Sequence, residues 1–132
     1  LVSTGLTGPP SSPSPTTNTA NVETWDGSSW TEVSNVNTQR YRVVGSGDAG
    51  SGLIFAGTNY PSTAMSAKTE SWNGTSWSEI NDLSTAREAG STTSGTGSTA
   101  ASTLLAGGTT PSVQSATEEW TSDLANKTIT AS

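Results

Sequence analysis

The 132-residue chain contains no cysteine and no histidine. This excludes disulfide bonds, thiol nucleophiles, zinc sites built on cysteine and histidine, and any Ser-His-Asp catalytic triad. Charged residues make up only 12% of the chain, with five basic and eleven acidic groups and a formal net charge of −6. Because the basic residues are scattered and form no stripe, we expect no nucleic-acid partner.

Long apolar runs are also absent. No stretch approaches the 18 or so apolar residues that a membrane-spanning helix needs, so we expect no membrane insertion. Hydrophobic residues make up 30% of the chain, and serine, threonine and glycine dominate, which resembles the composition of disordered chains. Five tryptophans and an internal repeat argue against disorder. No segment has the 3.6-residue periodicity of an amphipathic helix, which favours strands.

One eleven-residue stretch, residues 23–33, organises the sequence. It reads Glu-Thr-Trp-Asp-Gly-Ser-Ser-Trp-Thr-Glu-Val and returns 47 positions later, at 70–80, as Glu-Ser-Trp-Asn-Gly-Thr-Ser-Trp-Ser-Glu-Ile. A partial third copy follows at Glu118-Glu119-Trp120. A period of this size is typical of solenoids, propellers and arrays.

Each full copy of the stretch predicts a β-hairpin, because Asp-Gly and Asn-Gly tolerate the positive φ of tight turns. A two-residue turn would pair Trp25 with Ser28, whereas a four-residue loop would place Trp25 opposite Trp30. Side chains alternate between the faces of a strand, so both indoles lie on one face in either register. The same holds for Trp72 and Trp77.

We interpret the five tryptophans mainly as core between stacked sheets. A tryptophan buries roughly 150–250 Å², so two in each repeat could supply much of the packing of a thin sheet. The alternative is that these rings stack on sugars. The residues concerned are Trp25, Trp30, Trp72, Trp77 and Trp120.

Apolar segments ending in glycine precede each tryptophan segment, at residues 1–5, 53–57 and 104–108. The second and third of these segments pair with a further expected strand, at 42–47 in the second repeat and at 89–93 in the third, where a Gly/Ser/Thr-rich turn follows; the first repeat lacks this opening strand. With the two hairpin arms, a repeat carries four short strands, which is the make-up of a propeller blade. The last strand is expected at 127–131.

The predicted fold is therefore all-β, with about eleven strands in three repeats of roughly 47 residues. Residues 1–34 form a partial first blade that contains a Pro/Ser/Thr-rich loop at 6–20. Residues 35–81 form the second blade, and residues 82–132 form the third, terminal blade.

The apolar strand that ends in Gly107-Gly108, followed by the spaced Trp120, resembles the kelch repeat. Tyr60, between Gly57 and Trp72, adds the kelch-type tyrosine in one copy. A shortened kelch-like repeat, with Thr-Glu-x-Trp-Asn-Gly-x-Ser-Trp and Thr-Ala-Arg, is the closer likeness. It is similar to repeats in proteins of marine bacteria and their phages, including tail, fibre and appendage proteins. The resemblance covers nearly the whole chain apart from 6–20 and implies a β-propeller.

A closed propeller takes about four to eight blades, more than the three found here, and an open sheet edge invites pairing with other chains. Two ways of closing the ring remain open. Other copies of the chain could complete it, or the ring could include sequence missing from this chain. We expect self-assembly.

Two arginines and three glutamates recur with the repeat: Arg40 and Arg87, and Glu23, Glu70 and Glu118. We expect each guanidinium to bind carbonyl oxygens or a neighbouring glutamate between blades. Carboxylates that repeat with the fold do not converge across one scissile bond, as a glycosidase requires. No calcium-loop spacing is present. We therefore predict no enzymatic activity, no metal and no cofactor.

The leading functional hypothesis is a non-catalytic structural or adhesive module of a virion fibre or extracellular appendage. Its expected partners are copies of itself or other virion or appendage subunits, and its expected location is extracellular or in the virion. The alternative is a lectin-like propeller that binds surface glycans, with Tyr60 as a glycan contact.

Overall fold

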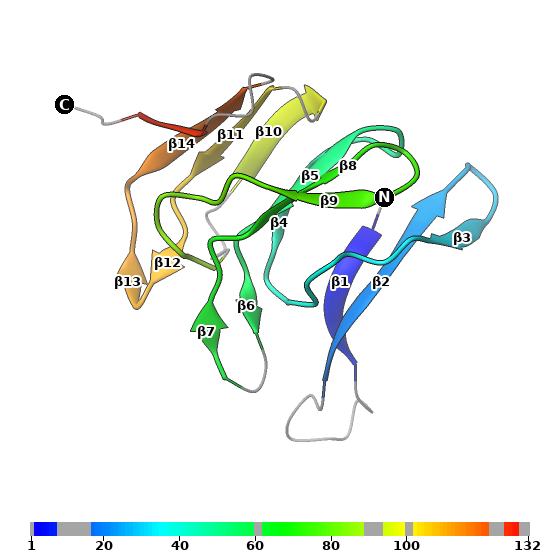
Figure 1. Cartoon of the computed structure of the whole chain (residues 1–132), viewed down its shortest axis with the longest axis horizontal. Helices are drawn as coiled ribbons and strands as arrows, with labels where there is room; N and C mark the ends of the chain where they lie inside the picture. The colour runs from blue at the N-terminus through cyan, green and yellow to red at the C-terminus, as the bar shows by residue number, and fades with distance from the viewer. Residues whose placement is uncertain are drawn as a thin grey trace.

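A computed structural model of the chain confirms the all-β expectation (Figure 1). The structure describes residues 2–7, 17–59, 62–88, 94–99, 102–121 and 126–129. None of these residues is helical, so the described part of the chain has no helix with the length and apolarity needed to cross a membrane.

The described strands form three larger antiparallel sheets and two short ribbons. The first sheet contains β1 (Val2–Thr7), β2 (Thr17–Trp25) and β3 (Trp30–Val33). The second contains β4 (Val44–Gly47), β5 (Gly52–Phe55), β8 (Thr69–Trp72) and β9 (Trp77–Ile80). The third contains β10 (Ser94–Thr99), β11 (Ser102–Ala106), β14 (Thr117–Thr121) and β15 (Asn126–Ile129). The ribbons pair β6 (Thr58–Asn59) with β7 (Ala64–Met65), and β12 (Thr109–Thr110) with β13 (Ser112–Val113).

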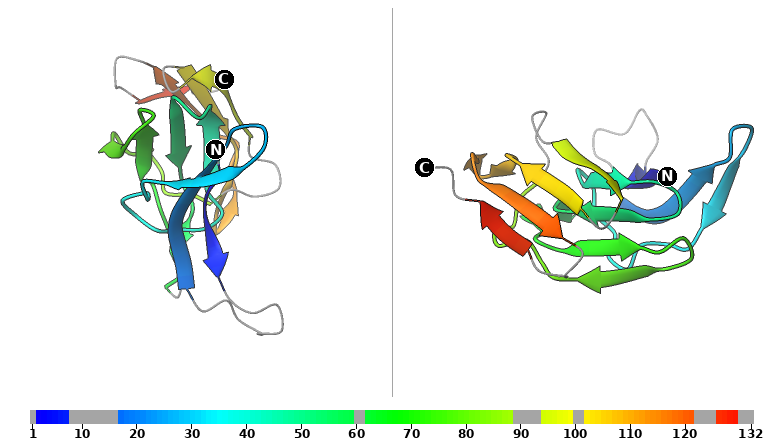
Figure 2. Two further views of the ribbon diagram at one scale, coloured as in Figure 1. Left: turned by 90° about the vertical axis from the view of Figure 1, so that its right-hand side faces the viewer. Right: turned by 90° about the horizontal axis from the view of Figure 1, so that it is seen from above.

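The three sheets follow one another in chain order, with the second between the first and the third (Figures 1 and 2). Within each sheet, strands that follow one another in the sheet order are also neighbours in the chain, apart from the ribbons inserted before β8 and β14. Both ribbons project from the same side of the molecule (Figure 1). Each larger sheet lies inside one of the three predicted repeats.

The first hairpin has the four-residue loop of the two registers considered. Trp25 is directly opposite Trp30, and the Asp26 amide donates to the Ser29 carbonyl oxygen at 3.2 Å. Gly27 adopts a φ of 107°, which glycine accepts without steric cost. The two-residue alternative, which pairs Trp25 with Ser28, is wrong.

The second hairpin repeats this construction. Trp72 is opposite Trp77, the Asn73 amide donates to the Ser76 carbonyl at 3.3 Å, and Gly74 has a φ of 92°. In both hairpins the two indoles lie on one face, with ring centroids 5.3 Å apart in the first and 5.2 Å in the second.

The predicted loop at 6–20 is too long. Strand β1 continues to Thr7 and β2 begins at Thr17, with Leu6 opposite Asn18 and Thr7 opposite Thr17. Threonine favours extended backbone, and each paired residue satisfies backbone donors and acceptors that a loop would leave to water. The prolines of this segment, at positions 9, 10, 13 and 15, lie outside the described residues.

Two other expected strands also differ from the structure. The strand expected at 42–47 begins at Val44, because Arg42 has a φ of 55° and leaves the extended region. In the third repeat, β10 occupies Ser94–Thr99, where a turn was expected, and residues 89–93 lie outside the described part of the chain. The two-residue strands of the ribbons are too short to produce a recognisable pattern, and the sequence did not predict them.

Within the residues that the structure describes, the core consists of two clusters, one at each boundary between sheets. Between the first and second sheets, Val22 and Val36 pack with Ile54, Trp72 and Trp77. Between the second and third sheets lies the second cluster, which contains Val44, Leu53, Phe55, Ala56, Leu83, Leu105 and Trp120.

Alternation along the strands therefore gives the second sheet two different faces. Its tryptophan face, with Ile54, Trp72 and Trp77, packs on the first sheet. Its opposite face, with Leu53 and Phe55, receives the third sheet, and we call it the receiving face. Both boundaries join a tryptophan face to the receiving face of the preceding sheet.

Candidate assembly site

The first joint, between the first and second sheets, is organised around Glu70 in β8. One carboxylate oxygen accepts the Arg40 guanidinium at 2.7 Å, and both side chains are fully buried. The other oxygen accepts the Asn37 amide at 2.6 Å, and the Thr38 amide donates to the same oxygen as Arg40 at 3.2 Å. Since Asn37, Thr38 and Arg40 all belong to the segment that leaves the first sheet, Glu70 fixes that segment to the second.

Arg40 is also held by carbonyl oxygens. Its Nε donates to Ala56 at 2.9 Å, and its Nη1 donates to Thr38 at 3.0 Å. The chain passes close over this side chain at Gly57, which has a φ of 106°; a Cβ there would lie 2.9 Å from the Tyr41 carbonyl oxygen. Glycine at this position thus lets the end of β5 approach the arginine segment.

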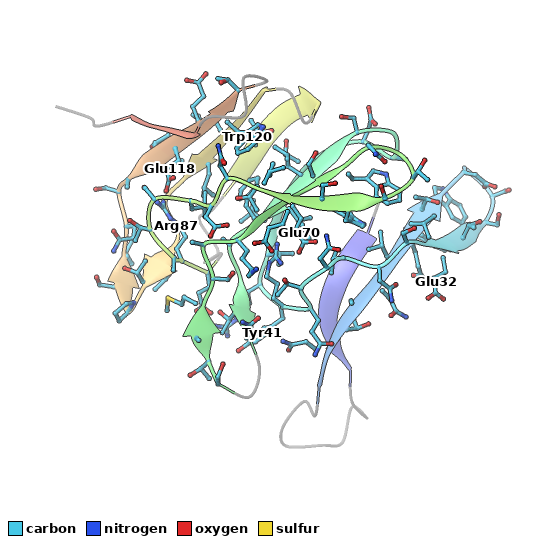
Figure 3. All side chains as sticks on the ribbon, viewed as in Figure 1. Glu32, Tyr41, Glu70, Arg87, Glu118 and Trp120 are labelled. Carbon is cyan, nitrogen blue, oxygen red and sulfur yellow. The ribbon has the colours of Figure 1, made fainter. Side chains whose placement is uncertain are left out.

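The second joint repeats the first with different residues. Arg87 pairs with Glu118 of β14, and both are almost completely buried. The Ser84 amide donates to the Glu118 carboxylate at 2.8 Å, and Arg87 donates to the Gly107 and Ala116 carbonyl oxygens at 3.0 and 3.2 Å. Figure 3 shows Arg87 and Glu118 together beside the third sheet, with Glu70 at the centre of the molecule.

The structure therefore places both predicted arginines and two of the three recurring glutamates inside the joints. The sequence analysis missed the backbone donors that complete each site. A signal for them exists, because Val36-Asn37-Thr38 and Leu83-Ser84-Thr85 are also 47 positions apart. In both copies an apolar residue followed by two polar residues marks the segment whose backbone amides donate to the glutamate of the next sheet.

Tryptophan side chains seal the first joint. Trp72 and Trp77 are 2% and 6% exposed. The indole Nε1 of Trp77 donates to the Ser34 carbonyl at 3.1 Å, and that of Trp72 donates to the Ala49 carbonyl at 2.8 Å. Both indole donors are thus satisfied in a buried position, as buried tryptophans require.

The second joint contains a single indole. Trp120 is buried, and the residue opposite it in β15 is Asn126 rather than a second tryptophan. A cavity of about 10 Å³ lies beside this ring, with Phe55, Leu83 and Leu105 also in its wall. That volume is roughly the minimum for one water molecule, so this cavity has no room for an organic ligand.

Trp25 and Trp30 do not lie in the core, and the expectation that they do is wrong. They are 47% and 53% exposed, on the face of the first sheet that points away from the second. The physical reason is that a tryptophan face is buried only by a preceding sheet, and no sheet packs on this one among the described residues. Their own hairpin has the same loop and ring spacing as the buried pair.

The same outer face carries Glu23, the counterpart of Glu70 and Glu118. Glu23 is exposed, and no ion pair is found for it within the described residues. Glu32, labelled in Figure 3, is directly opposite Glu23 in the register of β2 and β3. Tyr60, the predicted glycan contact, lies outside the residues that the structure describes.

Two further ion pairs of the described residues involve cations that are exposed. Lys68 pairs with Glu79 at 2.5 Å, and Arg42 pairs with Glu88 at 2.7 Å. Hydrogen bonds from the backbone amides of Ser29 and Ser28, and from their hydroxyls, lower the pKa of Asp26 from 3.8 to about 2. This carboxylate therefore stays ionised at neutral pH and anchors the first hairpin loop.

The described residues contain no group of three or more acidic, histidine or cysteine side chains that could hold a metal ion. Comparison of the chain with protein-family models and with curated proteins finds no match.

Proposed function

We propose that this chain is a non-catalytic structural or adhesive module of the kelch-like propeller type, which self-assembles through contacts between blades. We further propose that it belongs to a virion fibre or an extracellular appendage. The observation that carries the first proposal is the repeated joint, in which a buried arginine–glutamate pair fixes each sheet to the segment leaving the preceding one.

The joints favour an assembly role because their buried charged side chains hold one sheet to the next. Four charged side chains are buried at the boundaries in the described part of the chain, and they bind each other or the backbone of the connecting segments. A construction that occurs twice in succession is extendable, since each sheet presents one face of each kind. In this proposal the three sheets are successive blades, and further blades complete the ring.

The test is the native mass of the 132-residue chain. Sedimentation velocity over a concentration series from about 1 to 100 μM should show assembly to a defined multiple of the 13.4 kDa chain mass or to filaments. Negative-stain micrographs should then show rings or fibres. A single 13.4 kDa species at every concentration would refute self-assembly.

Carbohydrate binding is the second candidate function, and the exposed Trp25–Trp30 pair favours it. Aromatic rings with free faces can stack on sugar rings, and this pair is half-exposed. A glycan array probed with the wild-type chain tests this function. Saturable binding that is lost in Trp25→Ala or Tyr60→Ala would support this function. Absence of binding would refute it, and the assembly role would be the remaining proposal.

A further inference from the structure

We propose that the outer tryptophan face of the first sheet, formed by Trp25 and Trp30, docks on the outer receiving face of the third sheet of a second copy. The contact is head-to-tail and rests on the proposed assembly function. It would repeat between chains the contact of a tryptophan face with a receiving face that occurs twice within the chain.

The tryptophan face is already formed in the free chain. Trp25 and Trp30 have ring centroids 5.3 Å apart and an interplanar angle of 44°, against 5.2 Å and 38° for the buried pair Trp72 and Trp77. The two hairpins share loop length and register. Little rearrangement is therefore needed for the exposed pair to make the contacts that the buried pair makes.

The third sheet presents the matching face. Leu105 packs toward the second sheet, so its neighbour Leu104 points to the opposite side, where it is 37% exposed. Leu104 stands three positions before the glycine doublet, as Leu53 on the buried receiving face stands three positions before Ala56-Gly57.

The strand register gives a second, independent match. Facing positions on the receiving side of the first two sheets are Val22 with Val33, and Thr69 with Ile80. In the third sheet the corresponding pair is Thr117 with Ile129. The third sheet thus carries a β-branched pair at the same register position as the two receiving faces that are covered within the chain.

A second copy joined head-to-tail fits better than two tryptophan faces meeting symmetrically. In neither internal joint do two tryptophan faces meet. The outer tryptophan face also carries Glu23 and Glu32, so a symmetric contact would bring four carboxylates together, which like-charge repulsion opposes. In the third sheet Lys127 is opposite Glu119 in the register, so a basic position there is paired with an acidic one. A head-to-tail contact closes into a ring or continues as a filament, depending on its rotation.

The test uses two variants of the full chain that damage different faces. Trp25→Ser with Trp30→Ser removes the tryptophan face, and Leu104→Asp places a charge on the receiving face. Val113→Ser is the matched control, because Val113 is an 81% exposed apolar residue of the β12–β13 ribbon and belongs to neither the first nor the third sheet. Each face variant alone should lose association by roughly thirtyfold or more, as expected for a central contact, while the control assembles like the wild type.

Mixing the two face variants gives the decisive result. Each retains the face that the other lacks, so an equimolar mixture should form dimers and stop there. Urea unfolding of each variant checks that its fold is kept. If Leu104→Asp lowers the unfolding midpoint, Thr117→Asp replaces it as the receiving-face change.

The other outcomes are distinguishable. If the wild type assembles and neither face variant changes its mass, the docking contact is refuted while the assembly function stands. If only the tryptophan variant loses assembly, the contact is symmetric and the head-to-tail arrangement is refuted. If the wild type remains monomeric, both proposals fail; glycan binding that requires Trp25 would then assign the exposed pair to sugars.

Discussion

Arg40 and Glu70 form a 2.7 Å ion pair in which both side chains are fully buried, although 30 residues separate them. Removing the guanidinium leaves a carboxylate in the interior without its cation, which typically costs about 3–5 kcal/mol. We therefore expect Arg40→Met to lower the free energy of unfolding by about that amount, measured by urea denaturation of the monomer.

The surface pair Lys68–Glu79 supplies the control for this experiment. Its side chains are 39% and 45% exposed, and exposed pairs contribute less than about 1 kcal/mol. Lys68→Met should therefore change the unfolding free energy only slightly. Equal effects of the two substitutions would contradict the view that burial of the Arg40 pair makes it important.

Trp25 and Trp72 are equivalent in sequence but differ in burial, so they form a second matched pair. Trp72→Ala should lower the unfolding free energy by about 3–5 kcal/mol, because it leaves a cavity in the first joint. Trp25→Ala should change it by no more than about 0.5 kcal/mol in the monomer. The measurement is urea unfolding monitored by far-ultraviolet circular dichroism at a concentration where the chain is monomeric; comparable losses would place Trp25 in the core after all.

Gly57 and Gly27 share a positive φ, 106° and 107°, but differ in surroundings. A Cβ at Gly57 would lie 2.9 Å from both the Tyr41 carbonyl oxygen and Val43 Cγ1, whereas a Cβ at Gly27 would have no atom of the described residues within 4 Å beyond its two chain neighbours. Gly27→Ala should cost only the left-handed backbone penalty of about 1–2 kcal/mol. Gly57→Ala should cost clearly more in thermal unfolding, and equal costs would show that the backbone yields freely at this joint.

Asp26 gives a prediction about pH. Its folded pKa is about 2, below the ordinary 3.8, so its stabilising effect is fully present above about pH 4 and is lost as the pH falls toward 2. Asn73 accepts the same two backbone bonds in the second hairpin, at 2.9 Å each, without a charge. As the pH falls from about 4 toward 2, the urea midpoint of the wild type should therefore decrease relative to that of Asp26→Asn. A carboxyl resonance of Asp26 that titrates near pH 4 by NMR would overturn the assignment.

Local sequence predicted the strands and hairpins well because their causes are local. The Asp-Gly and Asn-Gly turns, and the alternation that places two indoles on one face, depend on residues within one hairpin. The 47-residue echo of Arg40 at Arg87 also directed attention to the positions that form the joints. Even so, the sequence left the register of the first hairpin open between two alternatives.

Burial could not be predicted in the same way, because it depends on what lies next to a face. Trp25 and Trp72 have nearly the same neighbours in the chain, but only Trp72 has a sheet in front of it. Likewise, the amides of Asn37 and Thr38 donate to the carboxylate of Glu70, which belongs to another sheet, so their role is not visible in the local sequence. The short ribbons gave no pattern, because two-residue strands are below the length at which alternation is visible.

In each joint the arginine precedes its glutamate in the chain, and this order matters while the polypeptide is leaving the ribosome. Arg40 is synthesised before Glu70, and Arg87 before Glu118. The arginine in the segment that follows each sheet can therefore form its ion pair only after the glutamate of the next sheet has been synthesised. A nascent chain halted between positions 40 and 70 therefore holds an arginine without its counter-ion.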